Sequence, residues 1–195
     1  MFTGIIETTG IVAKKECVGT NISFWISSSL SSELKIDQSL SHNGVCLTVE
    51  EIKDDLHKVT AIAETMEKTT LGIWQIGTLI NLERCMQMNG RLDGHIVQGH
   101  IDTVAECIAL TEKDGSWEYA FTTDKKFATL IIEKGSITLN GISLTIFNIS
   151  ETNFSVAVIP YTFTHTTMRQ LKLHDKVNIE FDIIGKYVNR IMNPA

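Results

Sequence analysis

Apolar side chains alternate with polar ones through much of this chain, at the period of two that is typical of a half-buried β-strand. Gly, Asn and Asp residues, which favour turns, separate the runs. The clearest runs have apolar positions at Ile22, Phe24 and Ile26, at Val45, Leu47 and Val49, at Trp117, Tyr119 and Phe121, at Ile137 and Leu139, at Val156 and Val158, and at Val177, Ile179 and Phe181.

Four stretches break the alternation and predict short helices, over residues 28–34, 64–71, 125–133 and 164–171. The clearest is 125–133, which ends before Gly135. Beyond Asp182, apolar residues recur at helical spacing and predict a C-terminal helix over residues 185–195. Its apolar stripe packs either on another copy of the chain, as an oligomerisation helix, or on its own barrel.

The chain contains an internal repeat. Residues 43–49, Asn-Gly-Val-Cys-Leu-Thr-Val, recur as residues 140–146, Asn-Gly-Ile-Ser-Leu-Thr-Ile, at an offset of 97 (140 − 43). Over residues 43–83 this offset gives twelve identities in 41 aligned pairs, where ordinary composition gives roughly two or three. At an offset of 95, residues 4–8 also match residues 99–103.

The repeat predicts two similar domains, over residues 1–90 and 91–184, with the boundary in the glycine-bearing segment 86–94. Each half holds about six short strands, the number expected of a small closed antiparallel barrel, which leaves no exposed sheet edge. The fold class expected is therefore all-β, with tandem six-stranded barrels and a few short helices.

The composition indicates which class of molecule the protein binds. The net charge is −6 and no Lys/Arg cluster occurs, which argues against nucleic acid or an anionic membrane and favours small molecules. The N-terminus lacks a signal-peptide pattern and no run approaches the ~20 apolar residues of a membrane span, so we expect a cytoplasmic protein. The four cysteines lack CxxC spacing, so neither a zinc site nor a disulfide framework is indicated.

Positions that are the same in both copies should describe a shared ligand. Hydroxyls and glycines, which offer hydrogen bonds and close backbone approach, suit a neutral heterocycle with a polyol chain. Each of these residues alone is equally an ordinary strand or turn residue. The matched pairs are Ser39/Ser136, Thr48/Thr145, Thr65/Thr162, Gly4/Gly99 and Gly44/Gly141.

Positions that differ between the copies should describe a division of labour. One copy offers a thiol, and the other offers a hydroxyl, an imidazole and an ammonium, which suits a reaction in which one bound molecule is deprotonated and another is attacked. Taken singly, a buried small residue, a structural histidine and a solvated lysine explain them as well. The differing pairs are Cys46/Ser143, Ile5/His100 and Asp37/Lys134.

Four segments of the sequence, residues 1–7, 43–49, 94–102 and 134–145, resemble riboflavin synthases, and the similarity extends from Met1 to about Arg190. The resemblance implies two Greek-key barrels and a C-terminal helix that joins three chains into a homotrimer. It also implies an active site between the N-terminal barrel of one chain and the C-terminal barrel of its neighbour.

The same resemblance implies the reaction. Two molecules of 6,7-dimethyl-8-ribityllumazine bind at each site, and a four-carbon unit moves from one to the other to give riboflavin and 5-amino-6-ribitylamino-uracil. No metal or other cofactor is expected, and association with lumazine synthase is a further expectation. The methyl group on carbon 7 is acidic because its carbanion delocalises into the ring, so the site must stack two rings with a base near one and a nucleophile near the other.

Carried onto this chain, the resemblance assigns catalytic candidates and binding positions. Asp182 is equally a strand-end carboxylate, and neither the nucleophile nor the base is singled out. The catalytic candidates are Ser143, His100, Cys46, Thr145, Ser39 and Asp182. The binding positions are expected in the first barrel at Gly4, Ile5, Ile6, Cys46, Leu47, Thr48, Thr60, Ala61, Ile62, Ala63, Glu64 and Thr65, and in the second at Gly99, His100, Ile101, Lys134, Ser143, Leu144, Thr145, Ile159, Pro160, Tyr161, Thr162, Phe163 and Thr164.

Two other functions are compatible with such barrels. A non-catalytic lumazine- or flavin-binding protein would share the fold, but it has no need of Cys46, His100 and Ser143 together. A flavin-dependent reductase would need a nicotinamide-binding βαβ unit, and the sequence has no GxGxxG motif to supply it.

Overall fold

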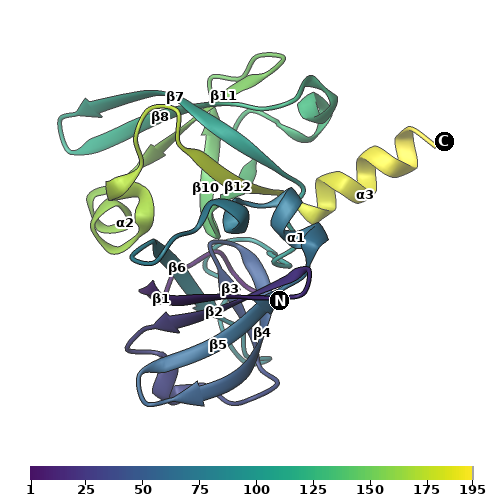
Figure 1. Cartoon of the computed structure of the whole chain (residues 1–195). Coiled ribbons are helices and arrows are strands. Elements are labelled where there is room, and N and C mark those ends of the chain that lie inside the picture. Colours follow the sequence, from purple (N-terminus) through teal and green to yellow (C-terminus); the bar gives the residue numbers. More distant parts are fainter. Residues whose placement is uncertain (195) are drawn as a thin grey trace.

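The computed structural model describes residues 1–194, which fold into two β-barrels followed by a helix (Figure 1). The first barrel contains β1 (Thr8–Val18), β2 (Asn21–Ser27), β3 (Ser39–His42), β4 (Val45–Lys53), β5 (Leu56–Ala61) and β6 (Leu79–Arg84). The second contains β7 (Thr103–Lys113), β8 (Ser116–Thr122), β9 (Ser136–Leu139), β10 (Ile142–Phe147), β11 (Asn153–Val158) and β12 (Lys176–Phe181).

Both barrels are closed, antiparallel and identical in strand order. The first runs β1-β2-β5-β4-β3-β6, and the second, read from β7, runs β7-β8-β11-β10-β9-β12. The alternation in the sequence explains the packing of strands such as β4 and β5, whose inward positions are buried and whose outward positions are mostly half-buried or exposed. In β6 and β12, successive residues are buried on both faces. The prediction of an all-β double-barrel fold is confirmed.

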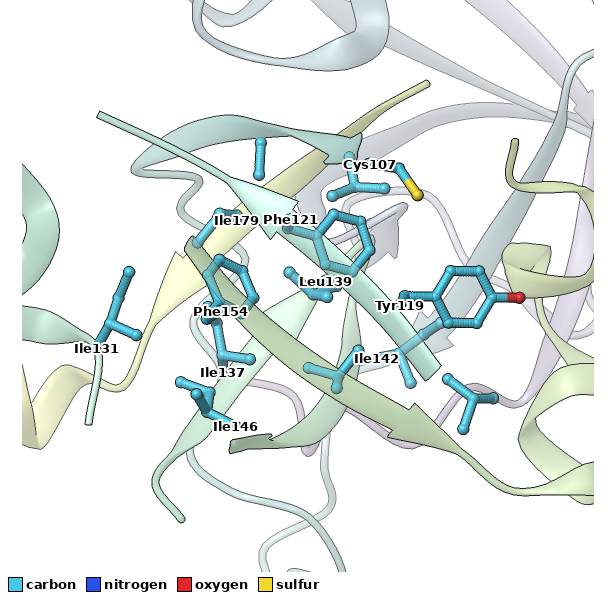
Figure 2. Packing of buried hydrophobic residues seen from close by; sticks show 14 of the residues in the cluster. Cys107, Tyr119, Phe121, Ile131, Ile137, Leu139, Ile142, Ile146, Phe154 and Ile179 are labelled. Atoms are coloured by element: carbon cyan, nitrogen blue, oxygen red, sulfur yellow. The ribbon is translucent and has the colours of Figure 1, made fainter. Parts of the chain in front are cut away.

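Each barrel encloses its own apolar core. Phe121, Phe154 and Leu139 lie in the middle of the second core, and Tyr119 lies at its edge, where its hydroxyl donates to the carbonyl of Met168 at 2.9 Å (Figure 2). The first core is built around Phe24, whose ring meets Trp74 edge-on at 5.4 Å between centroids.

The helical segments differ from those that the sequence predicts: two are shorter, and the other two are divided and begin before the predicted residues, at 63 and at 160. Residues 28–34 contain only the 3₁₀ turn η1 (Ser31–Glu33), and 125–133 becomes the 3₁₀ helix η3 (Lys125–Leu130). It ends early because Ile131 is extended and packs into the barrel core. The other two segments each divide in two, into α1 (Ala63–Lys68) with η2 (Thr70–Ile73) and α2 (Pro160–His165) with η4 (Thr167–Gln170), because Thr69 and Thr166 are extended.

The C-terminal helix α3 (Ile183–Met192) projects away from both barrels (Figure 1). It starts two residues before the predicted range because the Asp182 side chain accepts a hydrogen bond from the amide of Ile184 and caps it. Five of its apolar residues are exposed, namely Ile184, Tyr187, Val188, Ile191 and Met192, and three of these, Ile184, Val188 and Met192, line the groove between α3 and η3. Of the helices within residues 1–194, none has the length and hydropathy to cross a membrane.

The two barrels join through reciprocal hydrogen bonds that follow the repeat. The Asn81 side-chain amide donates to the carbonyl of Asn140, and the Asn178 amide donates to the carbonyl of Asn43, both at 2.9 Å. Their side-chain oxygens accept from the amides of the opposite barrel's threonine, Thr167 at 2.8 Å and Thr70 at 2.7 Å. The halves are therefore related by an approximate twofold axis.

Candidate active site

The segments that precede the two barrels cross over near this axis. Phe2 and Val97 form an antiparallel bridge, with the Phe2 amide donating to the Val97 carbonyl at 2.7 Å. Beyond the bridge, the Gly4 carbonyl accepts from the amide of Ser143 at 2.8 Å, and the Gly99 carbonyl accepts from the amide of Cys46 at 2.9 Å. Each leading segment therefore lies against the barrel of the other half.

This exchange corrects the predicted division of the binding positions. Gly4, Ile5 and Ile6 were expected in the first barrel, but Gly4 contacts Ser143 and Ile6 packs against the second core. Gly99, His100 and Ile101 were expected in the second barrel, but Gly99 contacts Cys46 and Ile101 packs against the first core. The repeat aligns the segments with their own halves and carries no information about which barrel they touch.

Two of the shared glycines are explained by this crossing. A Cβ on Gly4 would lie 2.6 Å from the Cβ of Ser143, and one on Gly99 would lie 2.5 Å from the Cβ of Cys46. Both also have positive φ, at 78° and 83°, a region that glycine enters without steric cost. The close approach predicted for these glycines is therefore to the opposite barrel.

Two buried glutamates at the ends of β6 and β12 anchor the crossing segments. Glu83 accepts from the amides of Thr3 and Gly4 at 2.6 and 3.0 Å. Glu180 accepts from the amides of Gln98, Gly99 and His100 at 2.6, 2.8 and 3.0 Å. Burial raises the pKa of both carboxyls, and these hydrogen bonds oppose the rise because they favour the carboxylate. These glutamates are not among the predicted site residues, although they are an identical pair in the repeat.

A pocket of about 310 Å³ lies where the second half's leading segment meets the first barrel. It brings together the predicted residues Cys46 and His100. The thiol and the imidazole, expected on opposite sides of a divided chemistry, therefore share one pocket. Its other lining residues are Val45, Glu64, Thr65, Lys68, Thr69, Gly99 and Ile101.

The electrostatics of this pocket favour a neutral thiol. Burial raises the pKa of the Cys46 thiol, and a hydrogen bond with Ser39 partly offsets the rise. His100 is exposed, and its backbone is held by Glu180. The imidazole is therefore free to turn toward a bound molecule while its backbone stays fixed.

The remaining hydroxyl candidates occupy equivalent places in the two barrels. Ser39 pairs with Thr48 across β3 and β4, and Ser136 pairs with Thr145 across β9 and β10. Ser39 and Ile5 line a second pocket of about 460 Å³. Ser136 and Asp182 line a third, of about 450 Å³, between η3 and α3. Of the catalytic candidates, Cys46 and His100 share one pocket and Ser39 and Asp182 line two others, whereas Ser143 and Thr145 line none of the three.

Some predicted binding residues already contact other side chains of the protein, and the others differ in exposure. Thr60 hydrogen-bonds to Ser23 and Glu50, both at 2.8 Å. Phe163 stacks on Trp117 with 3.7 Å between ring centroids. Leu47 and Ala61 are buried in the first barrel, whereas Ile62, Ala63, Ile159, Pro160, Tyr161 and Thr164 are exposed around α1 and α2, and Leu144 and Thr162 are half-buried.

Lys134 is exposed at a turn, with φ of 64°, and its ammonium lies 5.9 Å from the centre of the Phe147 ring. Its counterpart Asp37 has the same kind of backbone, with φ of 69°. The repeat therefore preserves the turn while it changes the charge.

The second barrel contains a histidine that the sequence analysis missed. His95 is buried, its Nδ1 lies 2.7 Å from the Ser143 hydroxyl, and its Nε2 lies 3.1 Å from the Thr138 hydroxyl. Burial lowers the pKa of His95, and the charge of Asp182 partly opposes this. At the offset of 95 its counterpart would precede Met1, so comparison of the two copies could not pair it. Its place in the segment 94–102 was the available signal.

Within residues 1–194, no cluster of three or more His, Cys, Asp or Glu side chains is arranged to hold a metal ion.

Comparison with known proteins agrees with the duplication. The model of the lumazine binding domain family matches the chain twice, over residues 3–85 and 98–182. Riboflavin synthase of Bacillus subtilis is 37% identical over 196 residues, covering 100% of this chain and 91% of that protein. The riboflavin synthase of Actinobacillus pleuropneumoniae is 38% identical over 193 residues, covering 98% and 90%.

Solved structures are similar in fold. The crystal structure of LumP complexed with riboflavin has a TM-score of 0.86 and 24% identity and covers 93% of this chain and 99% of that chain. That of LumP complexed with 6,7-dimethyl-8-(1'-D-ribityl) lumazine has a TM-score of 0.84 and 22% identity, with the same coverage. Both likenesses concern the double barrel alone.

Proposed function

This chain belongs to the riboflavin synthase family and has the paired lumazine-binding domains and the enzyme activity of that family. From this premise we propose where and how it acts. The substrate is 6,7-dimethyl-8-ribityllumazine, and two molecules react to give riboflavin and 5-amino-6-ribitylamino-uracil. Each barrel binds one of them. The observation that carries the proposal is the pocket in which Cys46 and His100, from opposite halves of the chain, meet.

The first binding position is the pocket beside the first barrel. Its half-buried thiol and exposed imidazole can both reach a bound ring, and the backbone of residues 99–101 forms one wall. Thr65 and Glu64 supply oxygen atoms at the rim, which suits the hydroxyls of a ribityl chain. The apolar side chains of Val45 and Ile101 suit the faces of the ring.

The second binding position is the equivalent surface of the second barrel, around Ser143. The backbone of residues 4–6 takes the place that residues 99–101 take in the first. Its chemistry is different, because a hydroxyl replaces the thiol and an exposed isoleucine, Ile5, replaces the exposed imidazole. Two identical molecules would therefore meet unlike groups, as a reaction between a carbon acid and an electrophile requires.

The reaction needs the two rings close together and shielded from water. Within one chain the candidate residues that line a pocket are divided among three pockets. We place the complete site between the first barrel of one copy and the second barrel of a neighbour. The apolar face of α3, from Ile184 to Met192, supports a homotrimer because it lies exposed in the single chain.

A protein that only binds lumazine or flavin is the second candidate. The LumP structures, described as complexes with lumazine, riboflavin and flavin mononucleotide, share its fold. The convergence of a thiol and an imidazole in one pocket, together with the hydrogen bond between His95 and Ser143, favours catalysis.

A direct assay tests the proposal. Purified protein incubated anaerobically with the lumazine and no added cofactor should release riboflavin and the diaminouracil in equal amounts. Binding of the lumazine without riboflavin would leave the binding function instead. Sedimentation alone and with lumazine synthase tests the trimer and the proposed association, and fractionation of cells tests the proposed cytoplasmic location.

A further inference from the structure

Three hydrogen-bonded polar side chains, Thr138, His95 and Ser143, lie on the outer face of β9 and β10, since Ile137, Leu139 and Ile142 fill the core side. The Thr138 hydroxyl is 3.1 Å from Nε2 of His95, and Nδ1 of His95 is 2.7 Å from the Ser143 hydroxyl. Thr138 is fully buried and His95 is 8% exposed. Ser143 is half-buried, so only the last of the three reaches the surface.

The position of Thr138 determines the direction of these hydrogen bonds. Its hydroxyl has one hydrogen, and within residues 1–194 the only hydrogen-bond partner found for it is Nε2 of His95. Leaving a buried hydroxyl hydrogen unpaired would cost free energy. Thr138 therefore donates, and Nε2 must be the unprotonated nitrogen that accepts.

A neutral imidazole with an unprotonated Nε2 has its hydrogen on Nδ1. Nδ1 then donates to the Ser143 oxygen, which acts as the acceptor in that bond. The hydrogen of Ser143 is left free to point away from His95. Gly4 and Gly94 are packed against Ser143, because a Cβ on either would lie within 3.0 Å of the Ser143 Cβ.

We infer that Thr138 and His95 are positioning residues that present Ser143 as a hydrogen-bond donor to the bound ring, and that His95 does not activate Ser143 as a nucleophile. The inference rests on the proposed function, since it assigns the acceptor to a ring nitrogen or carbonyl oxygen of a lumazine. That atom gains negative charge when the methyl group loses its proton or when a nucleophile adds to carbon 7. No covalent bond to Ser143 forms.

The first barrel lacks this device. Ser41 occupies the place of Thr138, and among the hydrogen bonds of residues 1–194 none joins a histidine to Ser41 or Cys46. Cys46 takes the place of Ser143, and there Ser39 lowers the pKa of the thiol against the effect of burial. Only in the second barrel, therefore, do buried side chains such as His95 and Thr138 orient the hydroxyl that would contact the ring.

Two substitutions of His95 distinguish a role as hydrogen-bond donor to Ser143 from a role as catalytic base. Asparagine places an N–H near the position of Nδ1 but cannot act as a base, whereas alanine removes both functions. We expect His95→Ala to lower kcat roughly tenfold with little change in KM, and His95→Asn to restore most of that loss with an unchanged pH profile. Equal impairment of both variants, with one limb of the pH profile lost, would overturn the inference.

Thr138 provides a second pair of variants. Thr138→Val has the same shape without the hydroxyl and should lower kcat, whereas Thr138→Ser should restore it. Retention of full activity by Thr138→Val would contradict the inference. Ser41→Ala, the equivalent deletion in the first barrel, is the matched control for a general effect of removing a hydroxyl from this strand.

The decisive measurement uses the intact wild-type protein without substrate. Nitrogen-15 NMR of histidine-labelled protein, with His95 assigned from the His95→Asn spectrum, reports which ring nitrogen holds the hydrogen. A hydrogen on Nδ1 alone is expected. A hydrogen on Nε2, or on both nitrogens, would overturn the inference whether or not the protein forms riboflavin.

Discussion

The two barrels share a strand order but differ in what fills them. In the second, Leu139 and Phe154 lie within an apolar core (Figure 2). In the first, the same positions are His42 and His57, both fully buried, with their Nε2 atoms 2.9 Å apart. The topology is thus compatible with either core, provided that the buried polar atoms are paired.

The histidine pair is satisfied at both ends. Nδ1 of His42 faces the carbonyl of Leu40 at 3.0 Å, and Nδ1 of His57 faces the Ser31 hydroxyl at 2.8 Å. Burial lowers the pKa of both rings, to about 4 for His57. The stability of the first barrel should therefore depend on acid pH through this pair, whereas the equivalent apolar pair of the second barrel has no group to protonate.

A second contrast lies outside the barrels, in the crossed leading segments. Because residues 4–6 contact the second barrel and residues 99–101 contact the first, a substitution in one half alters the pocket of the other. The unlike chemistry of the two pockets can therefore arise without any change in the barrel strands themselves.

The largest expected effect on stability comes from adding a side chain where a leading segment packs against the opposite barrel. Gly99→Ala puts a Cβ 2.5 Å from that of Cys46 at a φ of 83°. Overpacking and left-handed backbone strain together should lower the free energy of unfolding by about 3 kcal/mol or more. Gly115→Ala is the matched control, with a φ of 86° and nothing within 4 Å of the added Cβ. It should cost about 1 kcal/mol, and denaturant unfolding measures both.

An equal loss in Gly99→Ala and Gly115→Ala would mean that the crossing is not tightly packed. Gly4→Ala, on the opposite side of the axis, should behave like Gly99→Ala.

The second-largest effect is expected from acid, which should lower the free energy of unfolding of the first barrel. His57 and His42 are neutral when folded but take up protons when unfolded below pH 6.5. The unfolded chain then binds more protons, so the free energy of unfolding falls as the pH drops from about 6.5 towards 4. At pH 5 the His57 term alone is about 2 kcal/mol, using its folded value of about 4.

Replacing the pair by its counterparts, as His42→Leu with His57→Phe, should flatten this dependence. In that variant the single hydrogen of the Ser31 hydroxyl can be donated to the Ile26 carbonyl, 3.4 Å away. A Trp117→Phe background leaves Trp25 and Trp74 of the first barrel as the fluorescent probes of urea unfolding. The same slope in the double variant would show that other groups cause the acid sensitivity.

The smallest effects concern two equivalent ion pairs. Glu7 accepts from the amide of Arg84 and pairs with its guanidinium, whereas Asp102 accepts from the amide of Phe181 and pairs with Lys186. These groups are partly exposed, so Arg84→Gln and Lys186→Gln should each lower the free energy of unfolding by less than about 1 kcal/mol. A loss of several kcal/mol in thermal unfolding of either variant would contradict this.

The sequence predicted the barrels because their signals are local or repeated. Alternation identified strands such as 45–49, and the repeat showed that whatever fold formed would form twice. The crossing of residues 4–6 and 99–101 could not be read in this way, because an identical repeat is compatible with packing on either barrel. His95 was missed for a related reason, since the hydrogen bond to Ser143 joins residues 48 positions apart.

The central claim is that each site combines the first barrel of one copy with the second barrel of a neighbour, and complementation tests it most directly. The exchange of segments sets the design: one chain has Cys46→Ala with His100→Ala, and the other has Ser143→Ala with His95→Ala. The two chains are co-expressed with different affinity tags, and the mixed oligomers that contain both are isolated.

Each parent should be nearly inactive, and riboflavin formation by the mixed oligomers should recover to about a third of the wild-type rate, because in every mixed trimer one of the three interfaces joins two intact barrels. A rate no higher than the mean of the two parents would contradict the account.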